Sequence, residues 1–384
     1  MREGWTYKKL GEVCEYAKTR IKSRDITIEN YIGVDNLLQN CLGRTLATNV
    51  PEDVGLTEYR QGDVLIGNIR PYLKKIWLAD RTGGCNGDVL AIRRKDRYFN
   101  LLDTSYLYKC LSTQFFFDFA MHYAKGEKMP RGDKKEILDY PIPVPHLSEQ
   151  ERIISELDLL SGIIEKKKEQ LKEYDQLAQS IFYDMFGDPV TNEKGWEVKK
   201  LGDVAKIGTG ATPSREKEEL YYGGDIHWVK TTEVHNCEII NTEERITLLA
   251  IEETNCKIYP PNTLLMAMYG QGKTRGQIAK LKISAATNQA CAAIILDEKV
   301  SNLDFIYTLL LIKYEDIRAM AQGGNQANLN MKLVGSIPVI IPSLELQDQF
   351  ASKIDAIEKQ KALIKQSITE TETLFNSRMD YYFN

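Results

Sequence analysis

The sequence predicts an α+β protein in which two similar mixed α/β domains are separated by two long antiparallel coiled-coil helices, with approximate twofold symmetry. Three observations support this prediction. The chain has 384 residues, too many for one ordinary core. It repeats itself once, and each repeat ends in a long segment with apolar residues three and four apart. We place the first domain at 1–147, the first helix at 148–187, the second domain at 188–344 and the second helix at 345–384.

Two pairs of segments reveal the internal repeat. Gly4–Val13 returns 191 residues later as Gly195–Val204, with seven of ten positions identical. A second match, offset by 197 residues, aligns Tyr140–Pro145 with Ile337–Pro342, and each is followed by a charged helix start that contains glutamine. Self-similarity of this kind indicates duplicated structural units. The order along the chain is therefore domain, helix, domain, helix.

The two predicted helices carry one register. The apolar seam of the first, broken only by Lys167, is Ile153, Leu157, Leu160, Ile164, Leu171, Tyr174, Ala178, Ile181 and Met185. The equivalent positions of the second are Phe350, Ile354, Ile357, Ile364, Ile368, Phe375 and Tyr382, with Lys361, Thr371 and Arg378 as polar interruptions. A period of 3.5 residues is typical of a coiled coil. We expect helices of about 39 residues, roughly 58 Å long, that pair antiparallel. The alternative is that each covers its own domain.

Within the domains the sequence predicts short strands and one helix each. The β-like runs are Asp63–Ile66, Val89–Ile92, Thr263–Met268 and Cys291–Leu296. The helical stretches are Leu107–Tyr123 and Phe305–Ala321. This mixture defines each domain as α+β.

A composition of 43% hydrophobic, 27% charged and 9% aromatic residues is that of a soluble globular protein. Met1–Leu10 lacks the apolar core of a signal peptide, and the longest apolar runs, such as Ala290–Leu296, are too short to span a bilayer. We therefore expect a cytoplasmic protein with no membrane segment. Seven scattered cysteines without a C-x-x-C pair indicate neither a disulfide framework nor a zinc ribbon.

The net charge of −4 does not indicate a nucleic-acid binder until it is divided along the chain. Residues 1–140 hold 23 Lys and Arg against 19 Asp and Glu, a net of +4, whereas residues 188–336 hold 17 against 19, a net of −2. The helical segments 141–187 and 337–384 contribute −4 and −2. If the second domain binds DNA, its cations must therefore gather on one face.

Two loops that follow strands occupy equivalent places in the repeats. Gly67–Lys75 combines Asn and Arg, which suit bidentate contacts to base edges, with an aromatic residue and two lysines that suit phosphates. Tyr269–Arg275 is its counterpart in the second domain. A solvated hairpin is the alternative for either loop alone. Recurrence in both repeats favours a binding function.

Catalytic and metal-binding signatures are incomplete. Gly272-Lys273-Thr274 copies the end of a Walker loop, but that pattern needs glycine at the position of Ala267. His235 and Cys237 have no second pair at metal-ligand spacing. Tyr259–Asn262 lacks the residues that flank the Pro-Pro motif of amino-methyltransferases, and no G-x-S-x-G or H-E-x-x-H occurs. We expect no catalytic, metal or cofactor site in this chain.

Several short motifs together resemble the target-recognition domains of type I restriction-modification specificity subunits. They are the openings Gly4–Val13 and Gly195–Val204, the run Gly323–Asn330 before Ile337-Pro338, the run Met129–Lys135 before Tyr140-Pro141, and the helix start Pro145–Glu151. The resemblance covers essentially the whole chain, twice. One mild departure is Leu344–Gln347, where Glu-Leu replaces the usual acidic pair before Gln.

The resemblance implies a non-catalytic DNA-binding subunit in which each domain reads one half of a bipartite, asymmetric double-stranded sequence. It also implies that the helices act as a spacer and dock two DNA adenine methyltransferase subunits, with restriction-translocase subunits joining optionally. S-adenosylmethionine, ATP and Mg²⁺ would be bound only by these partners. A non-catalytic protein-interaction scaffold, with two domains on a coiled-coil strut, is the alternative that the mixed charge of the second domain permits.

The residues predicted to contact DNA lie in these loops and motifs. In the first domain they are Arg70, Lys74, Lys75, Lys128, Arg131 and Lys134. In the second they are Thr212, Ser214, Arg215, Tyr269, Gln271, Lys273, Arg275, Asn325, Gln326 and Asn328. Gly208–Arg215 is included because hydroxyls and backbone N–H groups on a glycine-rich turn suit phosphate contact, although a plain turn explains it equally. The three residues Asn325, Gln326 and Asn328 could instead satisfy buried backbone groups near the helix junction.

Overall fold

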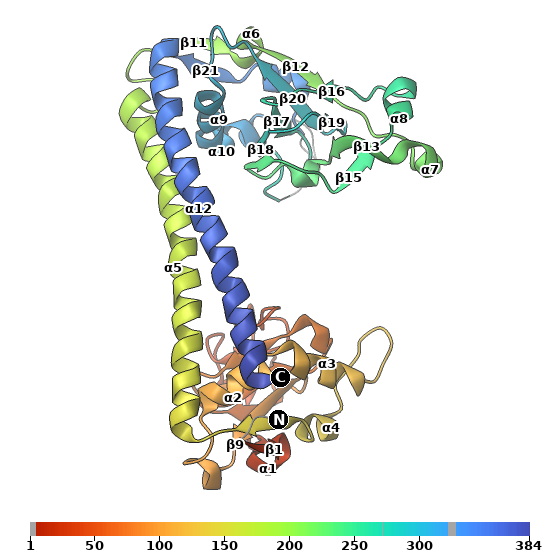
Figure 1. Cartoon of the computed structure of the whole chain (residues 1–384), viewed down its shortest axis with the longest axis vertical. Helices are drawn as coiled ribbons and strands as arrows, with labels where there is room; N and C mark the ends of the chain where they lie inside the picture. The colour runs from red at the N-terminus through yellow and green to blue at the C-terminus, as the bar shows by residue number, and fades with distance from the viewer. Residues whose placement is uncertain (1–4, 271, 322–327) are drawn as a thin grey trace. The chain divides into compact units, whose positions relative to one another are not determined.

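The computed structural model describes residues 5–270, 272–321 and 328–384. The chain forms two compact units, unit 1 of Met1–Lys168 with Gln366–Asn384 and unit 2 of Glu169–Lys365 (Figure 1). Both units combine helices with β-sheets, which confirms the predicted α+β class. Each long helix contributes residues to both units, so the domain limits placed from the sequence stay a prediction.

Unit 1 contains a two-stranded ribbon and two four-stranded sheets. The ribbon pairs β1 (Thr6–Lys9) antiparallel with β10 (Pro141–Val144). One sheet has the order β2-β9-β6-β7, with bounds Cys14–Tyr16, Val89–Arg94, Val64–Gly67 and Ile76–Leu78. The other has the order β3-β5-β8-β4, with bounds Arg20–Lys22, Gly55–Tyr59, Gly83–Cys85 and Tyr31–Ile32. The helices before α5 are α1 (Leu10–Val13), α2 (Thr104–Leu111), α3 (Gln114–His122) and α4 (Lys134–Leu138).

The described part of unit 2 follows the same plan with additions. Its ribbon pairs β11 (Glu197–Lys200) antiparallel with β21 (Pro338–Ile341). One sheet has the order β12-β20-β17-β18-β14, with bounds Ala205–Thr209, Cys291–Leu296, Leu264–Ala267, Ile278–Leu281 and Cys237–Ile239. The other has the order β15-β13-β19-β16, with bounds Glu244–Ile246, Tyr222–Val229, Ala285–Thr287 and Ile258–Tyr259. The shorter helices are α6 (Leu201–Val204), α7 (Glu218–Tyr221), α8 (Leu248–Glu253), α9 (Leu303–Ile312), α10 (Tyr314–Ala319) and α11 (Met331–Gly335).

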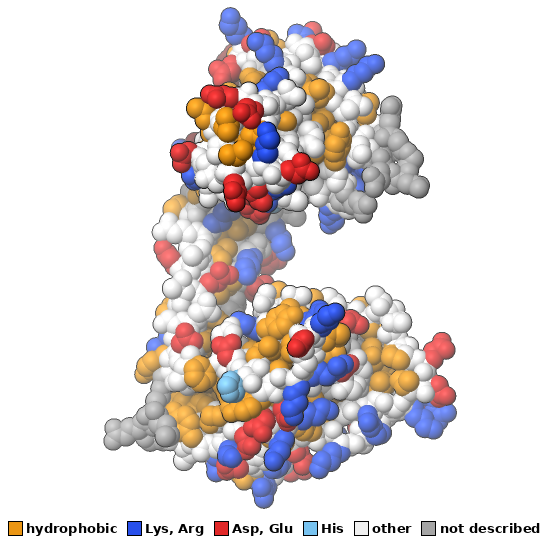
Figure 2. Space-filling model, turned by 90° about the vertical axis from the view of Figure 1, so that its right-hand side faces the viewer, with side chains coloured by type: hydrophobic (Ala, Val, Ile, Leu, Met, Phe, Trp, Pro, Cys, Tyr) orange, Lys and Arg blue, Asp and Glu red, His pale blue; other side chains and the backbone are white. Residues whose placement is uncertain are grey.

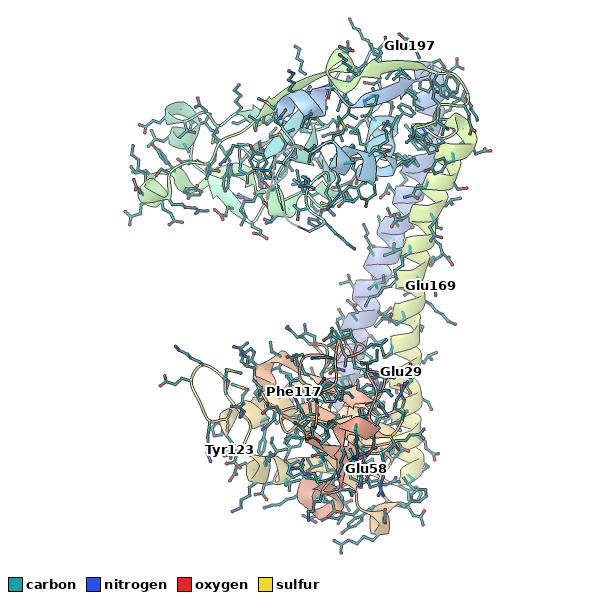
Figure 3. All side chains as sticks on the ribbon, turned by 180° about the vertical axis from the view of Figure 1, so that it is seen from behind. Glu29, Glu58, Phe117, Tyr123, Glu169 and Glu197 are labelled. Atoms are coloured by element: carbon teal, nitrogen blue, oxygen red, sulfur yellow. The ribbon has the colours of Figure 1, made fainter. Side chains whose placement is uncertain are left out.

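The four β-like runs are confirmed as β6, β9, β17 and β20, all of them interior strands. The prediction of one helix over Leu107–Tyr123 and one over Phe305–Ala321 is wrong, because each stretch consists of two helices. In unit 1 the Thr113 hydroxyl accepts a hydrogen bond from the Phe116 backbone N–H at 3.2 Å, so a new N-cap starts α3. The break lets apolar residues of both helices, including Phe117 (Figure 3), pack in one buried core.

The two long helices are confirmed, and within each unit they pack together. α5 (Leu147–Phe186) and α12 (Leu344–Phe383) have 40 residues each, and both ends are offset by the 197 residues of the repeat. In unit 1 they run antiparallel, because Arg152 contacts Tyr382 at 3.2 Å while Lys167, further along α5, contacts Ser367, earlier on α12.

Polar residues that interrupt the seam find partners across it. In unit 1 the Lys167 ammonium donates to the backbone and hydroxyl oxygens of Ser367 at 3.2 and 2.5 Å and to Thr371 Oγ1 at 3.0 Å. In unit 2 the Lys361 ammonium lies 2.8 Å from an Asp175 carboxylate oxygen. These bonds explain why lysine is tolerated in an apolar seam, since an ammonium group partly removed from water needs hydrogen-bond or ion-pair partners.

One fully buried glutamine joins each long helix to its domain. In unit 1 the Gln150 side chain accepts from the Asp103 backbone N–H at 2.9 Å and donates to the carbonyls of Leu101 and Pro145 at 2.7 and 2.8 Å. In unit 2 the same three bonds join Gln347 to the backbones of Asn302, Val300 and Pro342. The glutamine that follows each repeat therefore fixes the direction in which the helix leaves its domain.

All seven cysteines are unpaired, and five of them are buried. No helix within the described ranges is long and apolar enough to cross a lipid bilayer.

Candidate nucleic-acid interface

In unit 1 the two segments singled out from the sequence lie side by side. The Arg70 backbone N–H donates to the Pro130 carbonyl at 2.7 Å, and the Gly132 N–H donates to the Asn68 carbonyl at 3.3 Å. Between these bonds Ile69 forms an antiparallel bridge with Arg131. The loop after β6 is thus supported by the segment before α4, and the two predicted clusters form one surface.

Glycine at position 132 leaves room for two neighbouring side chains. A Cβ there would lie 2.9 Å from both Asn68 Oδ1 and Ile137 Cδ1. Arg70 and Lys74 adopt left-handed backbone conformations, with φ of 52° and 50°, on either side of the short 3₁₀ helix Pro71–Leu73. Such a backbone is costly for residues with a Cβ and is held by its surroundings.

The candidate cations of unit 1 differ in how far their side chains are engaged. Arg70, Lys128 and Lys134 are exposed, and within the described residues their side chains make no hydrogen bond or ion pair. Arg131 lies 3.3 Å from Asp88 in a largely exposed pair, which contributes little to stability. The Lys75 ammonium donates to the Val34 carbonyl at 2.6 Å, so Lys75 has a structural bond.

Lys74 is half-buried. Its carbonyl accepts from the Cys41 N–H at 2.9 Å. Figure 2 shows Lys and Arg side chains gathered along a band of the visible face of unit 1.

Unit 2 builds its loop in the same way. The Leu329 N–H donates to the Met268 carbonyl at 3.0 Å, and the Met268 N–H donates to the Ala290 carbonyl at 2.8 Å. The second bond matches the 2.8 Å bond from the Asn68 N–H to the Asp88 carbonyl in unit 1. The backbone that carries the two loops is therefore equivalent in the two units, although the loops differ in sequence.

The predicted residues of this second loop are only partly described. Tyr269 and Lys273 are exposed, and Arg275 and Asn328 are half-buried. The predictions for Gln271, Asn325 and Gln326 lie outside the described residues.

The Gly208–Arg215 segment has structural partners throughout. The Thr212 hydroxyl donates to the Gln289 side chain, and the Ser214 hydroxyl accepts from the Glu216 backbone N–H at 3.3 Å as an N-cap. Arg215 pairs with Glu218 at 2.8 Å and with Glu244 at 2.5 Å, and its guanidinium stacks on Tyr222 at 3.9 Å. These bonds fit the alternative of a plain turn.

The charge of unit 2 is unevenly divided along its sequence. Residues 211–256, which we call the acidic lobe, hold 4 Lys and Arg against 10 Asp and Glu. The remainder of 188–336 holds 13 against 9, a net of +4, which equals the net charge of residues 1–140. Lys230 of the lobe pairs with both Glu243 and Glu244. Most of the cations available to an anionic ligand therefore lie outside the acidic lobe, although Arg245 of the lobe is exposed and has no carboxylate of the described residues within ion-pair distance.

Sequence reasoning missed an asparagine turn that supports both loops. Asn86 in unit 1 and Asn288 in unit 2 each accept, through Oδ1, the backbone N–H two residues later at 3.2 Å. Each also donates its own N–H at 3.0 Å to the carbonyl of a neighbouring segment, at Ile32 and Val229. An Asn in the turn before the strand of both repeats was the available signal.

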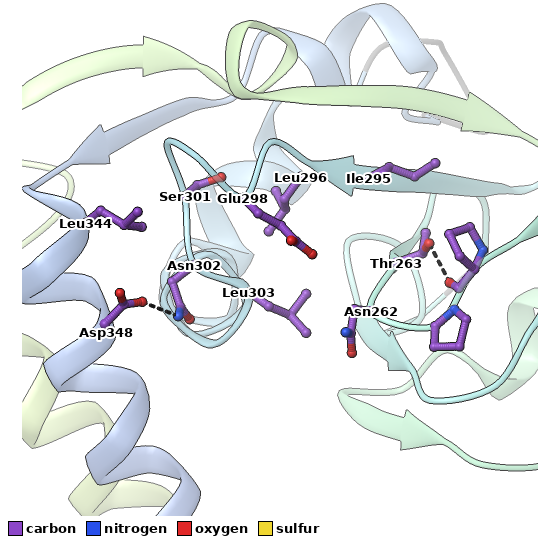
Figure 4. A pocket seen from close by; sticks show the side chains of 12 residues that line it. Asn262, Thr263, Ile295, Leu296, Glu298, Ser301, Asn302, Leu303, Leu344 and Asp348 are labelled. Atoms are coloured by element: carbon purple, nitrogen blue, oxygen red, sulfur yellow. Dashed lines mark hydrogen bonds between the residues drawn. The ribbon is translucent and has the colours of Figure 1, made fainter.

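A cavity of about 490 Å³ lies in unit 2 beside the start of α12 (Figure 4). Its polar groups bond to one another: Asn302 donates to Asp348 at 2.8 Å, and Thr263 donates to the Pro260 carbonyl at 2.8 Å. Among the described residues no group of three or more His, Cys, Asp or Glu side chains is placed to hold a metal ion.

The fold and this surface define a class: a duplicated α+β protein in which each unit carries a backbone-supported polar loop and both share a pair of long helices. The family described as "Type I restriction modification DNA specificity domain" matches residues 2–173 and 193–373. The chain belongs to this family.

Relatives and solved structures agree with the family. The MjaIX specificity subunit of Methanocaldococcus jannaschii is 24% identical over 273 residues, which is 66% of this chain and 62% of that protein. The EcoR124I/EcoR124II specificity subunit of Escherichia coli is 24% identical over 252 residues, 63% of this chain and 61% of that protein. The match thus spans less than two thirds of each relative.

Two solved structures have the same fold. One is the type I restriction-modification S subunit from M. genitalium, with a TM-score of 0.57 at 15% identity over 99% of this chain and 96% of that one. The other comes from a study of complex assembly and conformational transition of the type I R-M system, with a TM-score of 0.61 at 20% identity over 100% and 98%.

Proposed function

We propose that this chain is the sequence-specific DNA-binding specificity subunit of a type I restriction-modification complex, and that each unit reads one half of a bipartite target. The observation that carries the proposal is the recurrence of one backbone-supported loop in both units. The loop presents Arg70 in unit 1 and Lys273 in unit 2. Family membership supports the same function.

The proposed contacts fall into two kinds. Arginines suit bidentate contact to guanine in the major groove, whereas lysines suit phosphates and give no sequence information. In unit 1 the proposed residues are Arg70, Lys74, Lys128, Arg131 and Lys134. In unit 2 they are Tyr269, Lys273, Arg275 and Asn328. Gln271, Asn325 and Gln326 stay candidates on the sequence prediction alone. Lys75, Thr212, Ser214 and Arg215 are weaker candidates, because their side chains have structural bonds.

We further propose a division of labour in the cytoplasm. The chain supplies recognition and no catalysis, and it docks two DNA adenine methyltransferase subunits and, optionally, restriction-translocase subunits. S-adenosylmethionine, ATP and Mg²⁺ then bind to these partners. The long helices act as the spacer and the dock.

The test is to express the chain with its cognate methyltransferase subunits and to map methylated adenines in genomic DNA. We expect one motif with two fixed half-sequences, no methylation by the methyltransferase without the chain, and none by the chain with S-adenosylmethionine alone. Methyl transfer by the chain alone would refute the division of labour. A stable complex that methylates no defined motif would favour the protein scaffold instead.

A further inference from the structure

We propose that Tyr314 and Arg318, both on α10, are positioning residues for the recognition loop of unit 2, and that Arg318 also contacts a DNA phosphate. The inference rests on the proposed function and adds two residues that no loop motif in the sequence indicated. Both residues lie about 40 positions beyond the loop that they support.

A chain of hydrogen bonds connects α10 to the loop. Arg318 Nη1 donates to the Tyr314 hydroxyl at 2.7 Å, and that hydroxyl donates to the backbone carbonyl of Lys273. The direction of both bonds is fixed, since a guanidinium only donates and a carbonyl only accepts. The charged donor polarises the Tyr314 hydroxyl and strengthens its bond to the loop.

The loop closes tightly against this pair. The Gly276 N–H donates to the Ala267 carbonyl at 2.9 Å, and Gly276 has a φ of +86°. A Cβ at Gly276 would lie 3.1 Å from Arg318 Cγ and 3.6 Å from the Tyr314 ring. The loop therefore rests directly on Tyr314 and Arg318, so a change in either side chain moves the backbone that carries Lys273.

Arg318 keeps donors for an anionic ligand. It is half-buried, and its guanidinium lies 5.3 Å from the Tyr314 ring centroid. Within the described residues no carboxylate lies within ion-pair distance of it, whereas Arg215 in the acidic lobe has two such partners. One N–H of the five is used by Tyr314, and the others suit the oxygens of a phosphate.

Unit 1 supports its loop differently. There α3 packs against the 3₁₀ helix Pro71–Leu73, and the backbone N–H groups of Asn40 and Cys41 donate to the carbonyls of Leu73 and Lys74 at 3.0 and 2.9 Å. The bonds made by Tyr314 and Arg318 thus belong to unit 2 alone. A defect in them should affect one half of the target and leave the other unchanged.

The test uses the full chain in complex with its cognate methyltransferase and three variants: Tyr314→Phe, Arg318→Gln and the matched surface control Glu315→Gln. Methylation rates are measured on the cognate duplex and on duplexes with single changes in either half-sequence, and affinity is measured over a range of salt concentrations. Thermal melts establish that each variant folds, and Arg318→Met, which keeps the apolar stem and removes the charge, replaces Arg318→Gln if that variant does not.

Tyr314→Phe should lower discrimination in one half-sequence by about 2- to 10-fold, the range for one net hydrogen bond, and leave the other half unchanged. Arg318→Gln should reduce the slope of log affinity against log salt by about 0.9, the value for one phosphate. Glu315→Gln should behave as wild type. Equal loss in both halves, or no loss, would overturn the positioning role, and an unchanged salt slope would overturn the phosphate contact. If the wild-type complex methylates no defined motif, the proposed function itself fails.

Discussion

Replacing Gln150 or Gln347 with alanine tests how the long helices are joined to their domains. Each side chain is fully buried and makes three hydrogen bonds to backbone groups. Alanine leaves one N–H and two carbonyls without these partners. A buried group left unsatisfied costs about 1–3 kcal/mol. Because water can partly rehydrate the three groups, we expect each variant to lose roughly 2 to 4 kcal/mol of unfolding free energy.

Urea unfolding and calorimetry measure this effect. For a unit of this size, 1 kcal/mol corresponds to about 2–4 °C in Tm, so each variant should lower the Tm of its own unit by roughly 4 to 16 °C. The exposed glutamines Gln170 and Gln360, on the same helices, are the controls and should change stability by less than about 0.5 kcal/mol when replaced with alanine. The two buried sites share no partner, so their effects should add. A loss below about 1 kcal/mol at both sites would show that the joint is not held by these bonds.

Three further predictions concern single sites. Arg70→Ala and Arg275→Ala should each weaken recognition in one half-sequence only, by about 1 to 3 kcal/mol if the side chain contacts a base edge bidentately. Unchanged methylation motifs in both variants would show that these loops do not contribute to recognition. The hydrogen bond from Arg378 lowers the pKa of Glu156 below its ordinary value of 4.5, so this pair stabilises unit 1 at neutral pH, and that stabilisation is lost as the pH falls through the folded pKa. Thermal melts between pH 7 and pH 3 should show a steeper loss of Tm for wild type than for Glu156→Gln. Parallel curves for the two proteins would contradict this prediction. Burial raises the pKa of Cys14, Cys85 and Cys291 to about 12 and that of the half-buried Cys41 to about 11. Iodoacetamide at pH 8 should therefore modify the folded chain slowly, and first at the half-buried Cys237. Rapid labelling of all seven cysteines would refute the buried placement.

The long helices could be predicted from sequence because their signal is long. A seam such as Ile153, Leu157 and Ile164 recurs over many turns, and the same register returns 197 residues later. The breaks inside Leu107–Tyr123 and Phe305–Ala321 could not be predicted, because apolar residues continue along the sequence before and after each break. In the first stretch the cap is a single residue, Thr113, and local signals of this kind are easily outweighed.

The candidate surface could be predicted only in part. The loops stood out by composition, but the partners that decide which side chains are engaged are distant in sequence. Lys75 bonds to Val34, and Arg215 bonds to Glu244, 41 and 29 positions away. The asparagine turn at Asn86 was missed because its counterpart Asn288 is offset by 202 residues rather than 197, so it falls out of the alignment that revealed the repeat.

Lengthening both helices tests most directly the claim that this molecule reads two half-sequences at a separation set by its helix pair. One heptad inserted after Glu169 and one after Gln366 keeps the 3.5-residue seam and lengthens each helix by about 10 Å. DNA rises about 3.4 Å per base pair, so the unread gap in the methylated motif should lengthen by up to about three base pairs, with both half-sequences unchanged. Three added base pairs also rotate one half-sequence by about 100° relative to the other, which should lower the methylation activity but should not prevent the gap from lengthening. A folded variant that still methylates only the original spacing would contradict the account.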